Sequence, residues 1–395
     1  MSGKLRDSWV VWREKLNTKL NKYNPVPKTE DMTVPVGIDN EGKLWTEETG
    51  EDLPYVKFES DTPLTIARAT SQMWTTTGVV EYSFNNETWT EWPRTGVIKI
   101  EGNSNVVYLR GKNNKYFGMG TTTSGTHKRL IVTGTNVKIS GNIEGLLDYT
   151  IVENKGTPNA TSGTFRYLFE DNLNIVDASK LKFTRDSLPK QYMESMFRND
   201  TNLLYPPKVI EATSIGEESC AYSFCASGIL KTPKFKAKSV AKKGFCGAFQ
   251  DSHELQKAED FEVTRTTGEQ AFNYTFWKCL KLKNAPSLSS ITSITGDYTF
   301  RDMFCWCESL ISLPKFNVKS LPTGTFYYVF ANCPLIKLNF DQTSEYKNMW
   351  RIPYDGGGVE TGTDVFYGAF SGTGGVIDGG MILNTIYYTA NEIVG

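Results

Sequence analysis

The middle of the chain repeats a short apolar pattern with a period of about 27 residues. A phenylalanine marks every copy, and the intervals between successive copies are 28, 27, 25, 27, 28 and 26 residues. The marker residues are Phe169, Phe197, Phe224, Phe249, Phe276, Phe304 and Phe330. One unit of this length cannot bury its apolar side alone, so neighbouring copies must stack and share a core. The repeat therefore predicts a solenoid whose core contains these phenylalanines.

Three further positions of each copy keep their character relative to the marker phenylalanine. An apolar residue stands four positions before it, a small or polar residue three positions after it, and an aliphatic residue six positions after it. The aliphatic residues are Ile175, Leu203, Leu230, Leu255, Leu282, Leu310 and Ile336. Residues at i and i+4 share one face of a helix, so the first spacing predicts a short helix in copies such as Met193–Phe197. The aliphatic position predicts a brief extended stretch that follows.

The cysteines follow the same repeat. The chain has seven, all between Cys220 and Cys333, and it has no C-x-x-C pair. Cys279, Cys307 and Cys333 occupy the small position of successive copies, where earlier copies have Asn, Asp or Ser. This pattern predicts a ladder of reduced, structural thiols, and a soft-metal or redox site is the alternative. We expect no metal site and no cofactor.

The segment before the repeat has the pattern of a small β-sandwich-like domain over residues 51–155. Short apolar runs are separated by turns rich in Asn and Gly, and the stretch from Glu81 to Trp92 reads as a hairpin. Trp89 and Trp92 on this hairpin are candidates for stacking against a glycan. The alternative interpretation is that both tryptophans pack inside the domain.

The first 50 residues predict a helix followed by an extended linker. Leu5, Trp9, Trp12 and Leu16 recur at helical spacing and would form the apolar side of a helix over residues 5–22. We expect these four residues to mediate docking or oligomerisation. A helix folded back on the β domain is the alternative.

Short phrases in the repeat resemble a known family. Phe-Cys-Trp-Cys-Glu-Ser-Leu-Ile-Ser-Leu-Pro at 304–314 and Phe-Trp-Lys-Cys-Leu-Lys-Leu at 276–282 look like BspA-type leucine-rich repeats, and the resemblance covers about residues 160–340. It implies a protein that recognises other proteins, cells or matrix and does not catalyse a reaction. The hairpin pattern at 34–45 resembles phrases of phage structural proteins. Members of the BspA family are commonly exported, whereas this N-terminus has no pattern of a secretory signal.

Together these segments predict a β-rich α+β chain with four parts. These are an N-terminal docking helix and linker over 1–50, the β-sandwich-like domain over 51–155, a leucine-rich-repeat solenoid of about seven repeats over 156–345, and a Gly-rich β tail over 346–395. The tail would cap the solenoid or pair with another chain.

Composition narrows the classes of function. Lys+Arg 43 against Asp+Glu 44 leaves a net charge of -1, which argues against binding to nucleic acid or to acidic lipid. No window approaches the roughly 20 apolar residues of a membrane span. The chain has only two histidines, His127 and His253, and this scarcity argues against acid–base catalysis.

Three functions remain open. The first is a virion structural protein of a bacteriophage (head, collar or tail fibre), made in the host cytoplasm. It would contact other virion proteins through its N-terminus, and a host surface protein or glycan through the solenoid. We expect a homo-oligomer, and the analogy with fibres suggests a trimer. The alternative is a BspA-like bacterial adhesin at the cell surface that binds protein or glycan. A carbohydrate-active enzyme is disfavoured because no catalytic constellation can be identified.

Overall fold

The computed structural model describes most of the chain. The described residues are 36–38, 44–46, 53–69, 77–94, 99–117, 127–336, 360–373, 376–377, 381–382, 387–389 and 392–394. Two compact units divide the chain, Met1–Glu51 and Asp52–Gly395. In the first unit, β1 (Val36–Ile38) and β2 (Leu44–Thr46) pair antiparallel and form the hairpin expected there.

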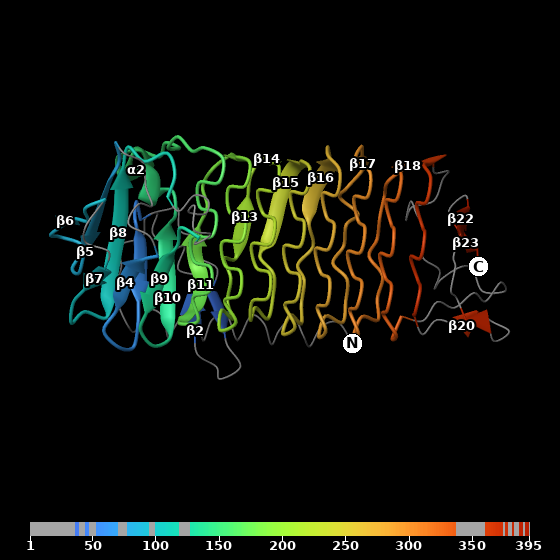
Figure 1. Cartoon of the computed structure of the whole chain (residues 1–395), viewed down its shortest axis with the longest axis horizontal. Helices are drawn as coiled ribbons and strands as arrows, with labels where there is room; N and C mark the ends of the chain where they lie inside the picture. Colours follow the sequence, from blue (N-terminus) through green and yellow to red (C-terminus); the bar gives the residue numbers. More distant parts are fainter. Residues whose placement is uncertain are drawn as a thin grey trace, which may run out of the picture. The chain divides into compact units, whose positions relative to one another are not determined.

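The second unit begins with two sheets that share one apolar core, and their strands pair antiparallel except for the parallel pair of β10 and β11 (Figure 1). The larger has the order β11-β10-β3-β8-β5-β6, and the smaller has the order β7-β4-β9. Along β3 and β4 buried residues alternate with partly exposed ones, as expected of strands with one face on a core. The strands are β3 (Val56–Glu59), β4 (Thr65–Arg68), β5 (Val79–Ser83), β6 (Thr90–Glu91), β7 (Lys99–Glu101), β8 (Val106–Lys112), β9 (Leu130–Thr133), β10 (Val137–Asn142) and β11 (Ile175–Lys182).

The hairpin predicted between Glu81 and Trp92 is confirmed. Strands β5 and β6 pair antiparallel, with Tyr82 opposite Thr90. Asn86 lies in the turn with a positive φ of 63°, a conformation that Asn tolerates better than most residues. The helix of the described residues, α2 (Gly145–Glu153), packs against β8 and is kinked at Asp148.

No core boundary separates the β-sandwich-like part from the solenoid, and this corrects the boundary expected at residue 155. Strand β10 pairs in parallel with β11, which lies inside the first repeat copy. Phe58 of β3 also contacts the first marker residue, Phe169, with ring centroids 6.1 Å apart. The β sheets therefore cover the first coil and bury the apolar edge that a solenoid end would otherwise expose.

The solenoid itself stacks short parallel strands (Figure 1). β12 to β17 belong to one sheet, and β18 pairs in parallel with β19. The bounds are β12 (Ser187–Leu188), β13 (Val209–Glu211), β14 (Ser214–Ile215), β15 (Lys234–Val240), β16 (Glu262–Thr266), β17 (Ser293–Ile294), β18 (Ser320–Leu321) and β19 (Glu360–Thr361). The chain is thus β-rich with a β-solenoid, as the repeat predicts.

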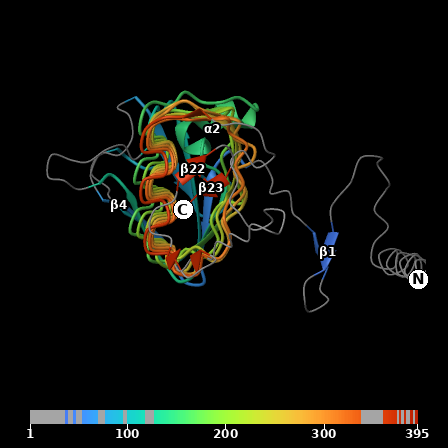
Figure 2. The same cartoon turned by 90° about the vertical axis from the view of Figure 1, so that its right-hand side faces the viewer.

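The short helix expected in each copy is absent, and a different structure has the same spacing of four. We call it the ribbon, and its segments are 163–172, 191–200, 218–227, 243–252, 270–279, 298–307, 324–333 and 364–373. In every segment one residue in four has a φ between 50° and 70°. Figure 2 shows these segments superimposed along one side of the solenoid.

Hydrogen bonds explain why the ribbon is not a helix. An α-helix bonds each N–H to the carbonyl four residues earlier. Here the Met196 N–H bonds the Met193 carbonyl at 3.1 Å, whereas the next N–H, of Phe197, bonds the Ser223 carbonyl of the following copy at 2.8 Å. Local turns and bonds between coils alternate in this way, so each coil satisfies the backbone of its neighbour. Residues four apart still share one face, and this face is buried in the core.

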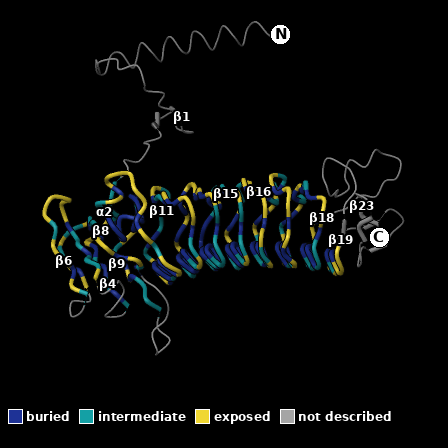
Figure 3. Tube along the Cα trace, turned by 90° about the horizontal axis from the view of Figure 1, so that it is seen from above, coloured by how far each residue is buried: buried dark blue, intermediate teal, exposed yellow. Residues whose placement is uncertain are grey.

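The marker phenylalanines form a continuous column, as predicted. Each is fully buried, and successive ring centroids lie 5.3 to 5.7 Å apart from Phe169 to Phe330. A second column of aromatic rings, from Phe245 to Phe326, runs beside it at 5.1 to 5.6 Å. Figure 3 shows that buried residues recur from coil to coil.

Two details of the repeat differ from expectation. In the third copy Ile229 is fully buried and Leu230 is partly exposed, because this copy is shorter and the core position moves by one residue. An additional copy follows the predicted end of the solenoid at residue 345. In it, Phe366 and Phe370 continue the two aromatic columns, at 5.4 Å from Phe326 and 5.2 Å from Phe330.

The last residues contain short strands, in keeping with the predicted β tail. Strands β20 (Val376–Ile377) and β21 (Met381–Ile382) pair antiparallel, as do β22 (Tyr387–Thr389) and β23 (Glu392–Val394). Residues 360–373 of the predicted tail belong instead to the solenoid, because they contain the additional copy.

Candidate functional site

The structure describes some of the predicted site residues and not others. Leu5, Trp9, Trp12 and Leu16 lie outside the described residues. Trp92 is fully buried, and the Arg68 guanidinium lies 5.2 Å from its ring centroid. A buried ring cannot stack on a glycan, so Trp92 packs in the core and the paired tryptophan platform is wrong.

Trp89 is half-buried and has its own partner. The Arg110 guanidinium lies 3.9 Å from the Trp89 ring centroid and 4.0 Å from that of Tyr149. Arg110 also donates to Glu81 at 2.7 Å. This arrangement accounts for the tryptophan by packing within the β sheets.

The cysteine ladder is confirmed. All seven thiols are free and buried. Cys279, Cys307 and Cys333 each point an Sγ at the marker carbonyl of the preceding copy, at 3.0 to 3.1 Å. Burial raises the pKa of Cys305 and of Cys333 to about 12, so these thiols stay protonated at neutral pH. Within the described residues no group of three His, Cys, Asp or Glu side chains could hold a metal ion.

The outer side of the ribbon is where side chains are free to vary. Inward positions are fixed by the core, whereas outward residues change from copy to copy. On the first copies the outward residues form a group of charged side chains, and on the last copies they form a group of aromatic side chains. The outer side of the ribbon is therefore our candidate functional site.

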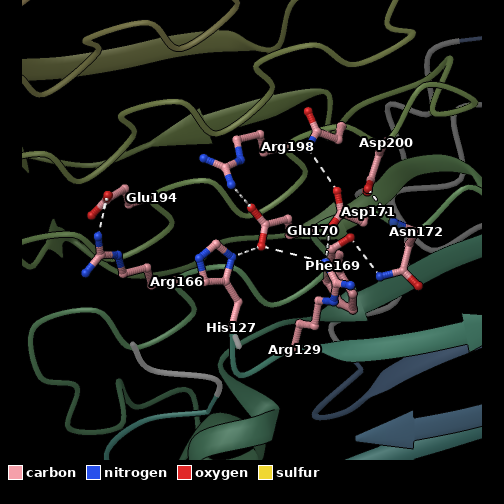
Figure 4. Close-up of polar contacts among 11 residues, drawn as sticks. His127, Arg129, Arg166, Phe169, Glu170, Asp171, Asn172, Glu194, Arg198 and Asp200 are labelled. Atoms are coloured by element: carbon pink, nitrogen blue, oxygen red, sulfur yellow. Dashed lines mark hydrogen bonds and ion pairs between the residues drawn. The ribbon is translucent and has the colours of Figure 1, made fainter. Parts of the chain in front are cut away.

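The charged group surrounds Glu170, which is 1% exposed (Figure 4). Glu170 pairs with His127, whose ring stacks on Tyr167 at 3.8 Å. Arg198 Nη2 lies 2.5 Å from Glu170 Oε1, and Arg129 Nη1 lies 3.8 Å from Oε2. The carboxylate is thus held by two arginines and one histidine, of which His127 and Arg129 come from the segment before the first copy and Arg198 from the second copy. These contacts fasten the first coils to each other and to the β sheets.

Asp200 lies beside this group and has a different environment. Its side chain is fully buried, and Oδ1 accepts the Asn172 backbone N–H at 2.7 Å (Figure 4). Oδ2 has no hydrogen-bond partner within the described residues. Desolvation raises the pKa of Asp200 well above its usual range, and the nearby Glu170 carboxylate adds to this effect.

The aromatic group lies on the copies marked by Phe276, Phe304, Phe330 and Phe370. We call it the aromatic strip, and it consists of Tyr274, Trp277, Tyr298, Trp306, Tyr327, Tyr328 and Tyr367. Trp306 is 43% exposed and Tyr367 is 53% exposed, which is unusual for rings of this size. The other members are half-buried.

Members of the strip contact one another across coils. Tyr327 and Tyr367 stack with ring centroids 4.9 Å apart, and Tyr298 meets Tyr327 edge-on at 6.1 Å. The Arg301 guanidinium lies 5.1 Å from the Tyr327 ring, and its Nε donates to Asp302 at 3.0 Å. Burial raises the pKa of the Asp302 carboxyl despite this bond. The strip therefore combines exposed rings with polar groups of fixed orientation.

Glycines on neighbouring coils make room for the tyrosines. A Cβ built on Gly324 would lie 2.3 Å from Cε1 of Tyr298, and one on Gly368 would lie 2.2 Å from Cε1 of Tyr328. Both glycines have a φ of about 60°, which is unfavourable for other residues. Each tyrosine ring thus lies against the backbone of the next coil. The sequence holds a signal for this, since Tyr328 and Gly368 stand two residues before their marker phenylalanines and Tyr298 and Gly324 stand six residues before theirs.

A separate hollow of about 380 Å³ lies among β3, β10 and β11. Three carboxylates and two lysines are among its lining residues, and none of these residues is aromatic. The β10–β11 register shifts on both sides of Lys138, beside this hollow. We regard this hollow as a weaker candidate than the ribbon, because it lacks exposed rings.

Comparisons with known proteins were made at three levels. No family model matches the chain, and no curated protein and no solved structure shows significant similarity to it. In the part of the chain that the structure describes, no helix is long and apolar enough to cross a membrane. The fold and the ribbon surface are therefore the findings on which a functional proposal must rest.

Proposed function

We propose that this chain is a non-catalytic attachment protein that recognises its ligand with the outer side of the ribbon. The observation that carries this proposal is the division of roles within each copy. Inward residues build a regular core, and outward residues are free to differ, so the solenoid can present a long surface of chosen side chains.

The choice of residues on the outer side supports recognition. Positive φ values suit Gly, Asn and Asp, yet Tyr274, Tyr298, Trp306 and Tyr328 occupy such positions in the last copies. A positive φ recurs in every ribbon segment, also at Tyr167 and Tyr222 of earlier copies, so the conformation belongs to the fold. What distinguishes the last copies is that aromatic rings gather there and that Trp306 and Tyr367 are exposed. Aromatic side chains and arginine are also the residues that most often dominate binding energy at interfaces.

We place this activity in the virion of a bacteriophage, as a head, collar or tail-fibre protein. The support is the resemblance of the repeat to BspA-type leucine-rich repeats and of the hairpin at 34–45 to phage structural proteins. The N-terminal segment with Leu5, Trp9, Trp12 and Leu16 would join the protein to other virion proteins or to further copies of itself.

Mass spectrometry of purified virions tests this proposal. We expect the protein in particles, and its absence from them would refute the virion assignment. Detection in washed bacterial envelopes, without particles, would favour the surface-adhesin alternative.

Deletion of residues 1–24 tests the anchoring role. These residues belong to a compact unit separate from the solenoid, so the truncated protein should keep the unfolding midpoint of the wild type. We expect it to be lost from assembled particles. Normal incorporation of the truncated protein would contradict the anchor.

A further inference from the structure

We propose that the aromatic strip is a binding site for a neutral polysaccharide that runs along the stacked coils. The inference rests on the proposed attachment function and adds to it the site and the chemical class of the ligand. It concerns four neighbouring coils and none of the residues that the sequence had suggested for glycan stacking.

The first argument is the geometry of the rings. Tyr298 and Tyr328 lie against glycines of the next coil, so they spread over the ribbon and do not project from it. Trp306, on the same copy as Tyr298, and Tyr367, on the copy after Tyr328, add two exposed rings. The negative face of an aromatic ring attracts the weakly positive C–H groups of a sugar ring, as it attracts the positive edge of another aromatic ring.

The second argument is the polar complement. A ligand rich in hydroxyl groups needs a few donors and acceptors in fixed positions beside its apolar contacts. Asp302 supplies an acceptor that is held by Arg301 at 3.0 Å, and Arg301 is itself held over Tyr327. Lys278 lies 4.1 Å from the Trp277 ring centroid and provides a donor near the other edge of the strip.

The third argument is the charge. Arg301 and Asp302 pair with each other, so among the charged residues described beside the strip Lys278 alone contributes a net charge. One lysine gives a strongly acidic polymer little excess of positive charge to bind, and electrostatic complementarity favours a neutral ligand. The coils repeat at the spacing of parallel strands, and Tyr327 and Tyr367 occupy equivalent positions on neighbouring coils, three residues before Phe330 and Phe370, which suits a ligand that itself repeats.

The full chain should be tested on an array of immobilised polysaccharides. The array would hold neutral polymers (dextran, mannan, galactan and β-glucan) and acidic ones (hyaluronan and alginate). We expect binding to at least one neutral polymer and none to the acidic polymers. Binding confined to acidic polymers, or to none, would overturn the inference.

Variants then locate the site. We expect Trp306→Ala and Tyr367→Ala each to weaken binding at least tenfold, since both remove an exposed ring without opening the core. Ile311→Ala is the matched control, because Ile311 is 57% exposed on the same copy as Trp306 but lies outside the ribbon. Circular dichroism and urea unfolding would show whether each variant is folded. Equal binding by Trp306→Ala, Tyr367→Ala and the wild type would refute the assignment of the strip.

Gly324→Ala supplies an independent variant that keeps every aromatic residue. Its methyl group would displace the Tyr298 ring, so we expect weaker binding with unchanged aromatic composition. Unchanged binding by a folded Gly324→Ala protein would count against the geometry argued above.

Periodate treatment of host envelopes separates failure of this inference from failure of the proposed function. Periodate destroys the vicinal diols of most sugars and leaves proteins largely intact. Loss of binding after treatment supports a glycan ligand. If treated envelopes still bind the wild type and Trp306→Ala equally, the attachment function stands and the glycan site falls. If untreated envelopes do not bind the wild type, the attachment function itself is wrong.

Discussion

Replacing Asp200 by asparagine should stabilise this protein at neutral pH. Asp200 occupies the small position of the second copy, where the corresponding Ser252 donates to the Phe224 carbonyl of the preceding copy at 2.7 Å. An aspartate in its charged form has no proton to donate there. An asparagine side chain has two N–H donors on Nδ2, and by analogy with Ser252 and Phe224 the carbonyl that it would reach is that of Phe169.

The magnitude follows from the buried Oδ2 atom. A buried polar atom without a partner costs about 1–3 kcal/mol, and a charged one costs more. At pH 7 the folded wild type must either bury a charge on Oδ2 or hold a proton that the unfolded chain has lost, and Asp200→Asn avoids both, so we expect the free energy of unfolding to rise by about 2 kcal/mol.

The effect should depend on pH with a definite sign. The folded-state pKa of Asp200 is raised above its unfolded value, which is about 3.9 for an ordinary aspartate. The stability that this group contributes is therefore fully present below about pH 4 and is lost as pH rises through the folded-state pKa. Asparagine does not titrate, so the advantage of Asp200→Asn should be small at pH 4 and should grow toward neutral pH.

Urea unfolding followed by circular dichroism from pH 4 to pH 8 would measure this difference. Asp297→Asn is the control, because it makes the same change of charge at an exposed position. If Asp200→Asn is less stable than the wild type at pH 7, or if its advantage does not vary with pH, the carboxylate is ionised and well satisfied. The reasoning would then be refuted.

Two other predictions concern the core. Phe276→Ala should lower the free energy of unfolding by about 3–5 kcal/mol, because the ring is fully buried and stacks on Phe249 and on Phe304 with centroids 5.3 Å apart in both pairs. Urea unfolding would measure this loss. A loss below about 1 kcal/mol would contradict the continuous column of rings. The cysteines should not react with a thiol reagent at pH 8 in the folded protein, because all seven are buried and burial raises the pKa of thiols such as Cys305 to about 12. All seven should react in denaturant, and rapid reaction of any of them in the folded state would count against the structural ladder.

Much of the solenoid can be read from the sequence because its core repeats. Phe276 is buried, and Cys279 takes its place in the ladder, as the period requires. A period near 27 does not predict the core position of Phe370, because 40 residues separate Phe370 from Phe330. Leu230 was assigned to the core in place of Ile229 because a shorter copy moves the position by one residue.

The candidate site was harder to predict, because it depends on contacts between copies. The aromatic residues of the strip are visible in the sequence, but nothing local shows that Tyr298 lies against Gly324 of the next coil. Trp92 looked as suitable for a ligand as any aromatic residue on a hairpin, and only the packing of Arg68 and the surrounding core shows that it is buried.

The sequence by itself determined that neighbouring copies stack and which residues form their shared core, because a unit of about 27 residues cannot bury its apolar side alone. The tertiary structure decided what the spacing of four residues means. A helix and the ribbon both place residues i and i+4 on one face, and they differ in where the backbone N–H groups find their partners. In this chain, alternate N–H groups of the ribbon bond to the next coil, and only the stacked structure supplies those carbonyls.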